Sequence, residues 1–143
     1  MRIFCFSPFG YEGNLVTVEV DLRRGIPAVD IVGLADNAVK ESRERMKSAI
    51  INSGLLFPPE RVLISLSPAD LKKEGAGFDL AIALAVLSAK ENLENEDSAF
   101  QMEPILVIGE LELNGNIRPV KAIHAAAATA YASGIRYCIV PGE

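Results

Sequence analysis

The alternation of apolar and polar residues in the first third of the chain predicts three consecutive strands. The first is the apolar segment "RIFCFSPFG" close to the N-terminus, and the second is "LVTVEVDL". In the second segment every other residue from Val16 to Leu22 is apolar, which is typical of a strand with one buried face. A third strand, "IPAVDIVG", is predicted for residues 26–33. Consecutive strands of this kind favour antiparallel pairing.

A helical period follows in "NAVKESRERMKSAIINSG", which is the clearest helix of the sequence. Asp36 is the predicted N-cap, and Gly54 lies just past the predicted end. The face predicted to pack against the core carries Val39, Ser42, Met46, Ala49, Ile50 and Ser53. The opposite face is charged.

After this helix the chain alternates strands with helices. "RVLISLSP" predicts a strand, and the next helix is expected from about Asp79 to Lys90. Residues 91–103 carry five acids and no bases, so they are expected to form an exposed connection.

The C-terminal part begins with a hairpin signal, because Asn114 and Gly115 interrupt the apolar run "PILVIGELELNGNIRPV". An alanine-rich helix, "KAIHAAAATAYASG", and a last strand, "RYCIVP", follow. The order of elements predicts one α/β two-layer domain over residues 1–143, with a mixed β-sheet and about three main helices.

Composition agrees with a folded domain and restricts its function. Half of the 143 residues are apolar and 23% are charged, so a packed core is expected and disorder is not. The net charge of −5 is unlike that of a domain that binds nucleic acid by itself, although a local basic face stays open.

Cys5 and Cys138 lie in apolar runs and are expected to be buried and reduced. Without a signal peptide or a membrane-length apolar run, the chain is expected in the cytoplasm.

The glycine-rich turn before the second helix, "GAGFDLA", raises the question of a phosphate loop. A Walker A loop requires a Lys-Ser/Thr pair directly after its last glycine, and this turn has none. Asp79 instead places a negative charge at the helix start, where it suits an N-cap and the helix dipole but would repel phosphate. Nucleotide binding at this turn is therefore not expected.

Catalytic and metal chemistry lacks a recognisable residue set. His124 is the single histidine and lies in the alanine-rich helix, where we expect a partly buried packing residue. No G-x-S-x-G elbow is present, and one histidine with two distant cysteines has no zinc-ligand spacing. The sequence predicts no catalytic residue, no bound cofactor and no metal.

One candidate nucleic-acid surface remains, on the charged face of the first helix. Four bases and two acids lie between Lys40 and Lys47. A solvated face with i,i+4 ion pairs is the preferred interpretation, and a phosphate contact is the alternative. The candidate DNA-binding residues are Lys40, Arg43, Arg45 and Lys47, joined by Lys72 and Lys73 if the following loop folds back.

Two long segments, "VGLADNAVKESRERMKSAI" and "PADLKKEGAGFDLAIAL", together with "IGELELNGNIRPVKAI" and "GIRYCIVP", resemble the ComM/YifB family of magnesium-chelatase-like AAA+ ATPases. The resemblance is to the N-terminal domain of that family and covers nearly the whole chain. It implies a fold similar to the C-terminal peptidase domain of Lon. Aligned with Lon, Gly77 stands where the nucleophilic serine belongs and His124 where the lysine belongs. Both members of the dyad are missing, and Ser65, Ser67 and Lys121 do not match the motif positions.

The resemblance implies a cytoplasmic motor that remodels DNA, by branch migration or helicase action during natural transformation. In the family this domain precedes an ATPase module that uses ATP and Mg²⁺ and assembles as a homo-hexamer. The expected role of residues 1–143 is to position DNA or subunits without catalysis. The alternatives are a protein-interaction or regulatory module, and a Lon-like peptidase with a relocated dyad. The isolated domain is expected to fold without binding ATP or a membrane.

Overall fold

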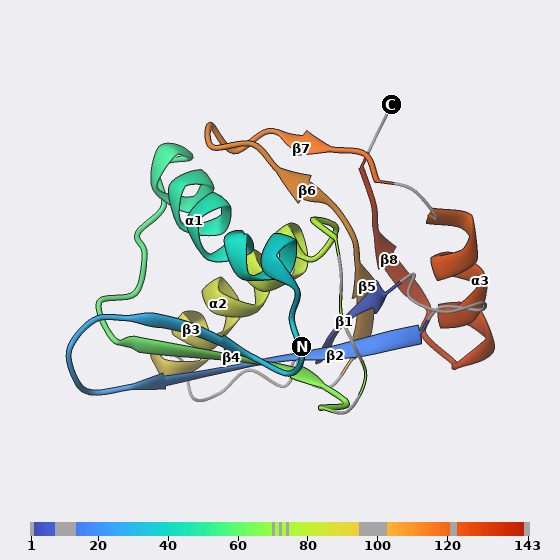
Figure 1. The fold of residues 1–143 in the computed structure, drawn as a ribbon, viewed down its shortest axis with the longest axis horizontal. Coiled ribbons are helices and arrows are strands. Elements are labelled where there is room, and N and C mark those ends of the chain that lie inside the picture. The colour runs from blue at the N-terminus through green and yellow to red at the C-terminus, as the bar shows by residue number, and fades with distance from the viewer. Residues whose placement is uncertain are drawn as a thin grey trace.

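The computed structural model describes residues 2–7, 14–69, 71, 73, 75–94, 103–120 and 123–141 (Figure 1). The elements are β1 (Arg2–Ser7), β2 (Asn14–Arg23), β3 (Val29–Val32), α1 (Asn37–Asn52), β4 (Arg61–Ser67), α2 (Asp79–Glu94), β5 (Pro104–Val107), β6 (Glu110–Leu111), β7 (Ile117–Arg118), α3 (Ile123–Ala132) and β8 (Tyr137–Ile139). The predicted α/β architecture with a mixed sheet and three helices is confirmed in these ranges. No helix among these residues is long and apolar enough to cross a bilayer.

The main sheet has six strands in the order β3-β4-β2-β1-β5-β8. β2 is antiparallel to both of its neighbours, whereas β3–β4, β1–β5 and β5–β8 are parallel pairs. The antiparallel prediction is therefore confirmed for β1 and β2 but wrong for β3. β4, not β3, pairs with the second edge of β2. The chain passes from β3 to β4 through α1, and strands joined by such a crossover pair in parallel.

α1 begins and ends where the sequence predicts. The Asp36 side chain accepts a hydrogen bond from the backbone nitrogen of Val39 at 2.8 Å, and Gly54 adopts a φ of +82° beyond the C-cap. The buried face consists of Val39, Ser42, Met46, Ala49 and Ile50. Ser53, which the sequence pattern places on this face, is exposed because the helix has already ended at Asn52.

α2 is the central core helix and packs against α1, β1 and β2. Ala81, Ile82 and Val86 are fully buried. The helix runs to Glu94, so the first four residues of the expected polar connection are helical instead. Residues 95–102 of that connection lie outside the described residues.

The hairpin prediction is confirmed. β6 and β7 pair antiparallel, and Gly115 closes the turn with a φ of +98°. The backbone nitrogen of Glu112 donates to Asn116, and the side chain of Asn52 on α1 donates to the Leu113 carbonyl at 2.7 Å. The first bond closes the hairpin turn, and the second attaches the hairpin to the C-terminal end of α1.

The two cysteines differ in environment. Cys5 is fully buried, as predicted, and burial raises the pKa of its thiol to about 12. Cys138 is exposed, so the prediction of burial is wrong for this residue. Its strand, β8, is the last of the sheet order and is exposed along its whole length.

Candidate functional site

The glycine-rich turn before α2 is a packed junction. The Gly77 carbonyl accepts hydrogen bonds from the backbone nitrogen of Gly109 at 3.1 Å and from the Cys5 thiol at 3.5 Å. A Cβ atom at Gly77 would lie 3.6 Å from Val120, which is ordinary van der Waals contact. Gly77 therefore packs against Cys5, Gly109 and Val120, and it has no side chain of its own to offer chemistry.

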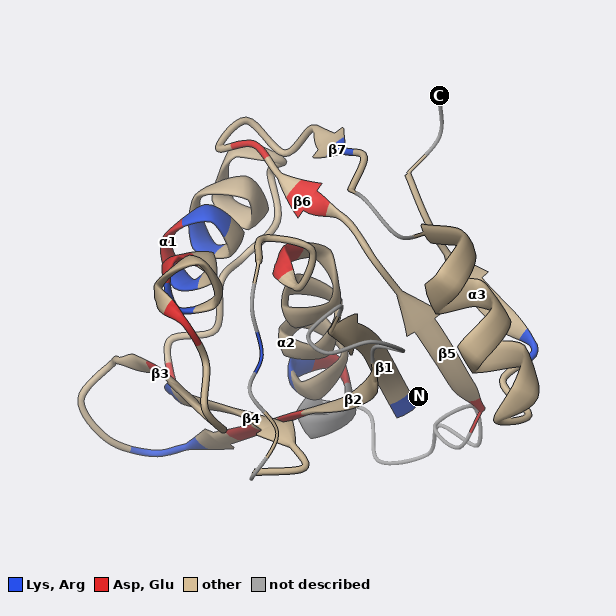
Figure 2. Cartoon of the chain, turned by 45° about the vertical axis from the view of Figure 1, so that its right-hand side comes forward, with Lys and Arg blue, Asp and Glu red and all other residues tan. Residues whose placement is uncertain are grey.

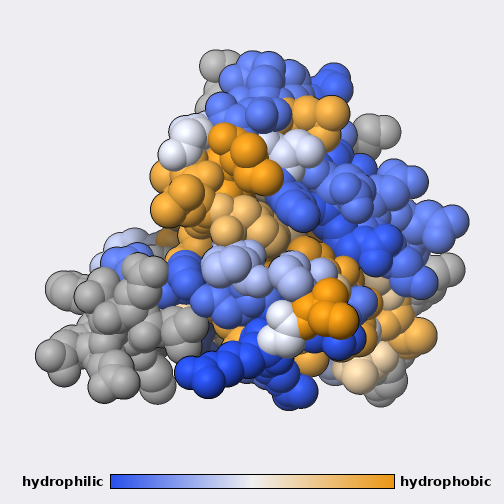
Figure 3. All heavy atoms as spheres, turned by 90° about the vertical axis from the view of Figure 1, so that its left-hand side faces the viewer, coloured by the Kyte–Doolittle hydropathy of each residue, from blue (hydrophilic) through white to orange (hydrophobic). Residues whose placement is uncertain are grey.

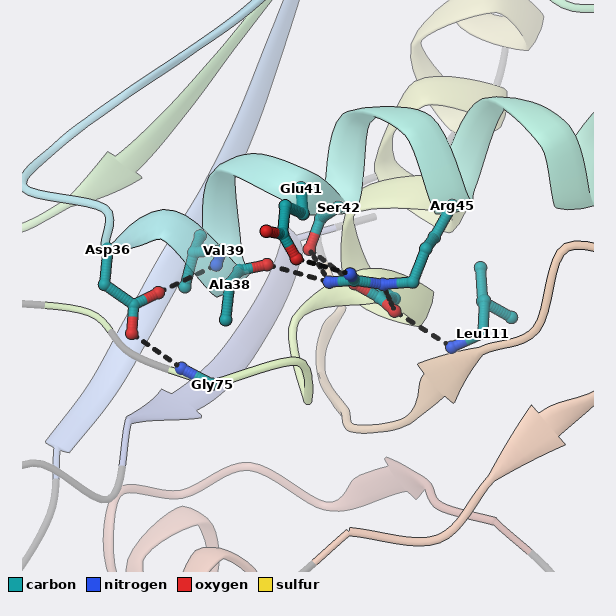
Figure 4. A network of polar contacts seen from close by, with 9 residues as sticks. Asp36, Ala38, Val39, Glu41, Ser42, Arg45, Gly75 and Leu111 are labelled. Carbon is teal, nitrogen blue, oxygen red and sulfur yellow. Dashed lines mark hydrogen bonds and ion pairs between the residues drawn. The ribbon is translucent and has the colours of Figure 1, made fainter.

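Asp79 stands at the first position of α2 and holds three elements together. Figure 4 shows its partners Ser42, Arg45 and Leu111 converging on one point. Its buried carboxylate accepts hydrogen bonds from the Ser42 hydroxyl and from two nitrogens of Arg45, at 2.7 and 3.0 Å. It also accepts from the backbone nitrogen of Leu111 in β6, at 3.0 Å. The carboxylate charge suits the helix N-terminus, as expected. Asp79 is the first residue of the helix and not the residue before it, so the N-cap expectation is wrong, and its bonds reach α1 and β6.

Arg45 is built into this junction. Its guanidinium also donates to the Ala38 carbonyl at 2.7 Å and approaches Glu41 at 3.4 Å. Only 20% of its side chain is exposed, and the bond to Asp79 raises its pKa. Arg45 was predicted as an exposed candidate for DNA contact. That exposure is not observed, because the side chain turns inward to neutralise the buried Asp79 carboxylate.

A second junction ties the start of α1 to the loop after β4. Ala35 and Lys73 form a parallel backbone bridge, and the Asp36 carboxylate accepts from the backbone nitrogen of Gly75 at 3.2 Å. This bridge folds Lys73 inward, where it is fully buried and donates to the Pro68 carbonyl. Lys73 therefore cannot extend the basic surface of α1 as expected, and Lys72 lies outside the described residues.

The remaining basic residues of α1 are Lys40, Arg43 and Lys47, all of which are exposed. Figure 2 shows basic and acidic residues interleaved along this helix. The ammonium group of Lys47 lies over the Phe57 ring, 5.4 Å from its centroid, at a groove that Arg43 also lines. These three cations are what remains of the candidate DNA-binding surface.

The groove also contains carboxylates, which restrict how anionic a ligand it can take. Glu44 and Glu60 line it beside the two cations. Glu60 is paired with Lys90 on α2 at 2.6 Å, and that bond lowers its pKa. With two acids among its lining residues, the groove does not form a strongly positive phosphate site.

The two positions aligned with the Lon dyad do not assemble a reactive pair. Gly77 has no side chain, and His124 is exposed on α3, where a partly buried packing residue was expected. Ser65 and Ser67 are half-buried in β4, and Lys121 lies outside the described residues. No group of three or more potential metal ligands occurs among the residues that the structure describes.

An exposed apolar patch lies at the C-terminal end of α1 and the tip of the hairpin. Figure 3 shows apolar side chains gathered on this side of the molecule, next to hydrophilic ones. The members are Ile51, Leu55, Leu56 and Leu113, each at least half exposed. We call these four residues the α1–hairpin patch.

Sequence reasoning missed the Ser42–Arg45–Asp79 network and the Phe57 groove. A signal for the network was present, because Ser42 and Arg45 are three residues apart at the border of the apolar face of α1. The partner Asp79 lies 34 residues further along the chain. Local spacing could not supply that contact.

Residues 18–143 match the family model described as subunit ChlI of Mg-chelatase. The uncharacterised protein YifB of Escherichia coli is 44% identical over 90% of this chain, and the competence protein ComM of Haemophilus influenzae is 36% identical over 85%. An uncharacterised protein of Mycobacterium tuberculosis is 39% identical over 99% of the chain. The matched stretches cover 24%, 23% and 27% of these relatives, so the chain spans about a quarter of their length.

Proposed function

The chain belongs to the family described as subunit ChlI of Mg-chelatase, and we propose that it is the non-catalytic N-terminal domain of a ComM/YifB-like AAA+ ATPase that remodels DNA. In this proposal the ATPase module lies in the part of the longer protein outside residues 1–143. It would bind ATP and Mg²⁺ and assemble as a hexamer. The present domain positions DNA or neighbouring subunits.

One observation carries the non-catalytic role: the reactive groups around the glycine-rich turn are already bound within the fold. The Ser42 hydroxyl donates to Asp79, and the Asp79 carboxylate accepts from three different residues. The Cys5 thiol stays protonated at neutral pH, because burial raises its pKa to about 12. A nucleophile needs a free lone pair and access to substrate, and none of these three groups offers both.

The proposed DNA role is supported by the name of ComM as a competence protein and by the exposed cations of α1. The three cations can each offer one phosphate contact, and they belong to a domain whose net charge is −5: Lys40, Arg43 and Lys47. A single copy would therefore bind DNA weakly and with strong salt dependence. Several copies in a hexamer would raise the overall affinity by engaging one strand together.

The test uses the full-length protein. Its ATPase rate is measured with single-stranded, branched and no DNA, and again after deletion of residues 1–143. We expect DNA to stimulate the intact protein, and the deletion to reduce stimulation while leaving the DNA-independent rate. Equal stimulation with and without residues 1–143 would remove the DNA-positioning role. A full-length protein that DNA does not stimulate would contradict the DNA-remodelling proposal itself.

The non-catalytic part has its own test. Purified residues 1–143 are expected to leave casein intact and to give no saturable ATP heat in calorimetry. Protein cleavage that a single serine-to-alanine change abolishes would restore the peptidase alternative.

A second candidate function is a protein-interaction module, which the α1–hairpin patch favours. Leu56 is 89% exposed beside three further apolar side chains, and contiguous exposed apolar surface marks interaction sites. Replacing Leu56 and Leu113 with serine in the full-length protein separates the two functions. Loss of assembly with intact DNA affinity would favour the interaction module. Unchanged assembly would remove the patch from consideration.

A further inference from the structure

β8 is an apolar strand that is exposed throughout. Tyr137 is 57% exposed, Ile139 38% and the following Val140 39%, and Cys138 between them is exposed as well. Successive residues of a strand point to opposite faces of the sheet. Both faces of β8 therefore carry exposed side chains.

The neighbouring strand β5, in contrast, is buried at residues that pair with β8. In the register of β5 and β8, Val107 lies opposite Ile139 and Leu106 lies opposite Cys138. Val107 and Leu106 are fully buried, whereas their partners are exposed. Parallel strands are normally covered on both faces. The covering layers of this domain thus stop one strand short of the sheet edge.

The two edges of the sheet differ in protection. β3, at one edge, carries Asp30 in its middle, paired with Arg61 of β4 at 3.3 Å. β8, at the other edge, contains only tyrosine, cysteine and isoleucine. Charged residues on an edge strand discourage pairing with further strands, and β8 contains none. Among the described residues no strand occupies the outer side of β8.

We propose that β8 is a docking edge for a further segment of the same polypeptide in the longer protein. That segment is apolar and extended, pairs with the outer edge of β8, and covers Tyr137 and Ile139. This proposal rests on family membership and on the greater length of the relatives, and it does not depend on the DNA role. The stretch that matches 99% of this chain is only 27% of the Mycobacterium tuberculosis relative, so such proteins contain ample further chain.

A segment of the same polypeptide fits better than a second copy of the domain. A tethered segment is present at a high effective concentration. Binding of a second copy costs translational and rotational freedom, and a strand of three residues offers few hydrogen bonds to offset that cost.

The test uses Cys138 as a reporter on the strand and Cys5 as an internal control. Both thiols are followed by maleimide labelling and peptide mass spectrometry, in the 143-residue chain and in the full-length protein. In the 143-residue chain Cys138 should react and the buried Cys5 should not. In the full-length protein Cys138 should react at least about tenfold more slowly, as expected for a site that is exposed only by local opening. This protection should persist on dilution to the monomer.

The variant Ile139→Asp, made in the full-length protein, should restore Cys138 labelling while Cys5 stays protected. Continued protection of Cys5 shows that the core is folded, so gain of Cys138 labelling then reports local loss of the docked segment. Labelling of wild-type Cys138 at the same rate in both proteins would overturn the proposal. Protection that disappears on dilution would overturn it in favour of a second copy.

Discussion

Arg45 on α1 donates two hydrogen bonds to the carboxylate of Asp79 at the start of α2, with Nε 2.7 Å from Oδ2 and Nη2 3.0 Å from Oδ1. The Asp79 side chain is fully buried, and that of Arg45 is 80% buried on the same scale. A fork of this kind fixes both direction and distance between two helices. Since Leu111 also donates to Asp79, one carboxylate sets the arrangement of α1, α2 and the hairpin.

We expect Asp79→Ala to destabilise the domain by about 3–5 kcal/mol, because it leaves a mostly buried guanidinium without its partner. The free energy of unfolding is measured in urea by circular dichroism. Ser42→Ala should cost less, about 1.5–3 kcal/mol, since it removes one hydrogen bond to a charged group.

The pairing itself is tested by a double-mutant cycle with Arg45→Met and Asp79→Leu. The combined change should cost clearly less than the sum of the two single changes. Arg43→Met, on the exposed face of the same helix, serves as the matched control and should stay within about 0.5 kcal/mol of wild type. Additive costs would show that Arg45 and Asp79 do not act as a pair.

Features fixed by neighbouring residues were predictable from the sequence. The alternation in β2, the Asp36 cap and the turn at Gly115 each depend on residues a few positions apart, and all three are confirmed. Features fixed by distant contacts were not. The parallel partner of β3 and the inward turn of Arg45 depend on residues 30 or more positions away.

The sequence predicts the wrong burial for two residues: Lys73 is buried where exposure is expected, and Cys138 is exposed where burial is expected. A lysine is normally exposed, but the backbone bridge to Ala35 carries Lys73 inside. An apolar run is normally covered, but β8 lies at the sheet edge, so Cys138 is exposed. Side-chain type alone therefore gave the wrong burial in both places.

Gly33 is required by a close backbone approach. Its φ is +111°, and a Cβ atom there would lie 2.1 Å from the Leu66 carbonyl oxygen. We expect Gly33→Ala to destabilise the domain by more than about 2 kcal/mol, because backbone must move in addition to the strained φ. Thermal and urea unfolding both measure this change.

Gly54→Ala is the matched control. Gly54 also has a positive φ, +82°, but its Cβ position has no atom within 4 Å. Its cost should be limited to the conformational penalty of about 1–2 kcal/mol. Equal losses for the two variants would show that the contact with Leu66 has no effect.

Stability should fall in alkaline solution through the Cys5 thiol. Burial raises its pKa from 9.0 to about 12, so the unfolded chain releases this proton first as the pH rises. The contribution is fully present below pH 9 and is lost progressively between pH 9 and 12, with a slope of about 1.4 kcal/mol per pH unit. The measurement compares urea unfolding of wild type and Cys5→Ala across this range. A difference between the two that does not change with pH would contradict the prediction.

The exposed cations of α1 are the proposed DNA contact of this domain. Reversing Arg43 and Lys47 to glutamate in the full-length protein should lower DNA-stimulated ATPase and weaken DNA binding. Each cation that neutralises a phosphate contributes roughly one to the slope of log affinity against log salt, so the double variant should also flatten the salt dependence. Binding is measured by fluorescence anisotropy at several salt concentrations, and folding by thermal unfolding.

Arg24→Glu with Arg136→Glu is the control, since it changes the charge by the same amount at exposed positions elsewhere. If DNA affinity depends only on the net charge of the protein, both double variants will lose affinity equally. If α1 forms the contact, the Arg43 and Lys47 variant will lose much more. Unchanged affinity and stimulation in that variant would exclude this face of α1 and favour the interaction-module function, for which the α1–hairpin patch is the remaining candidate surface.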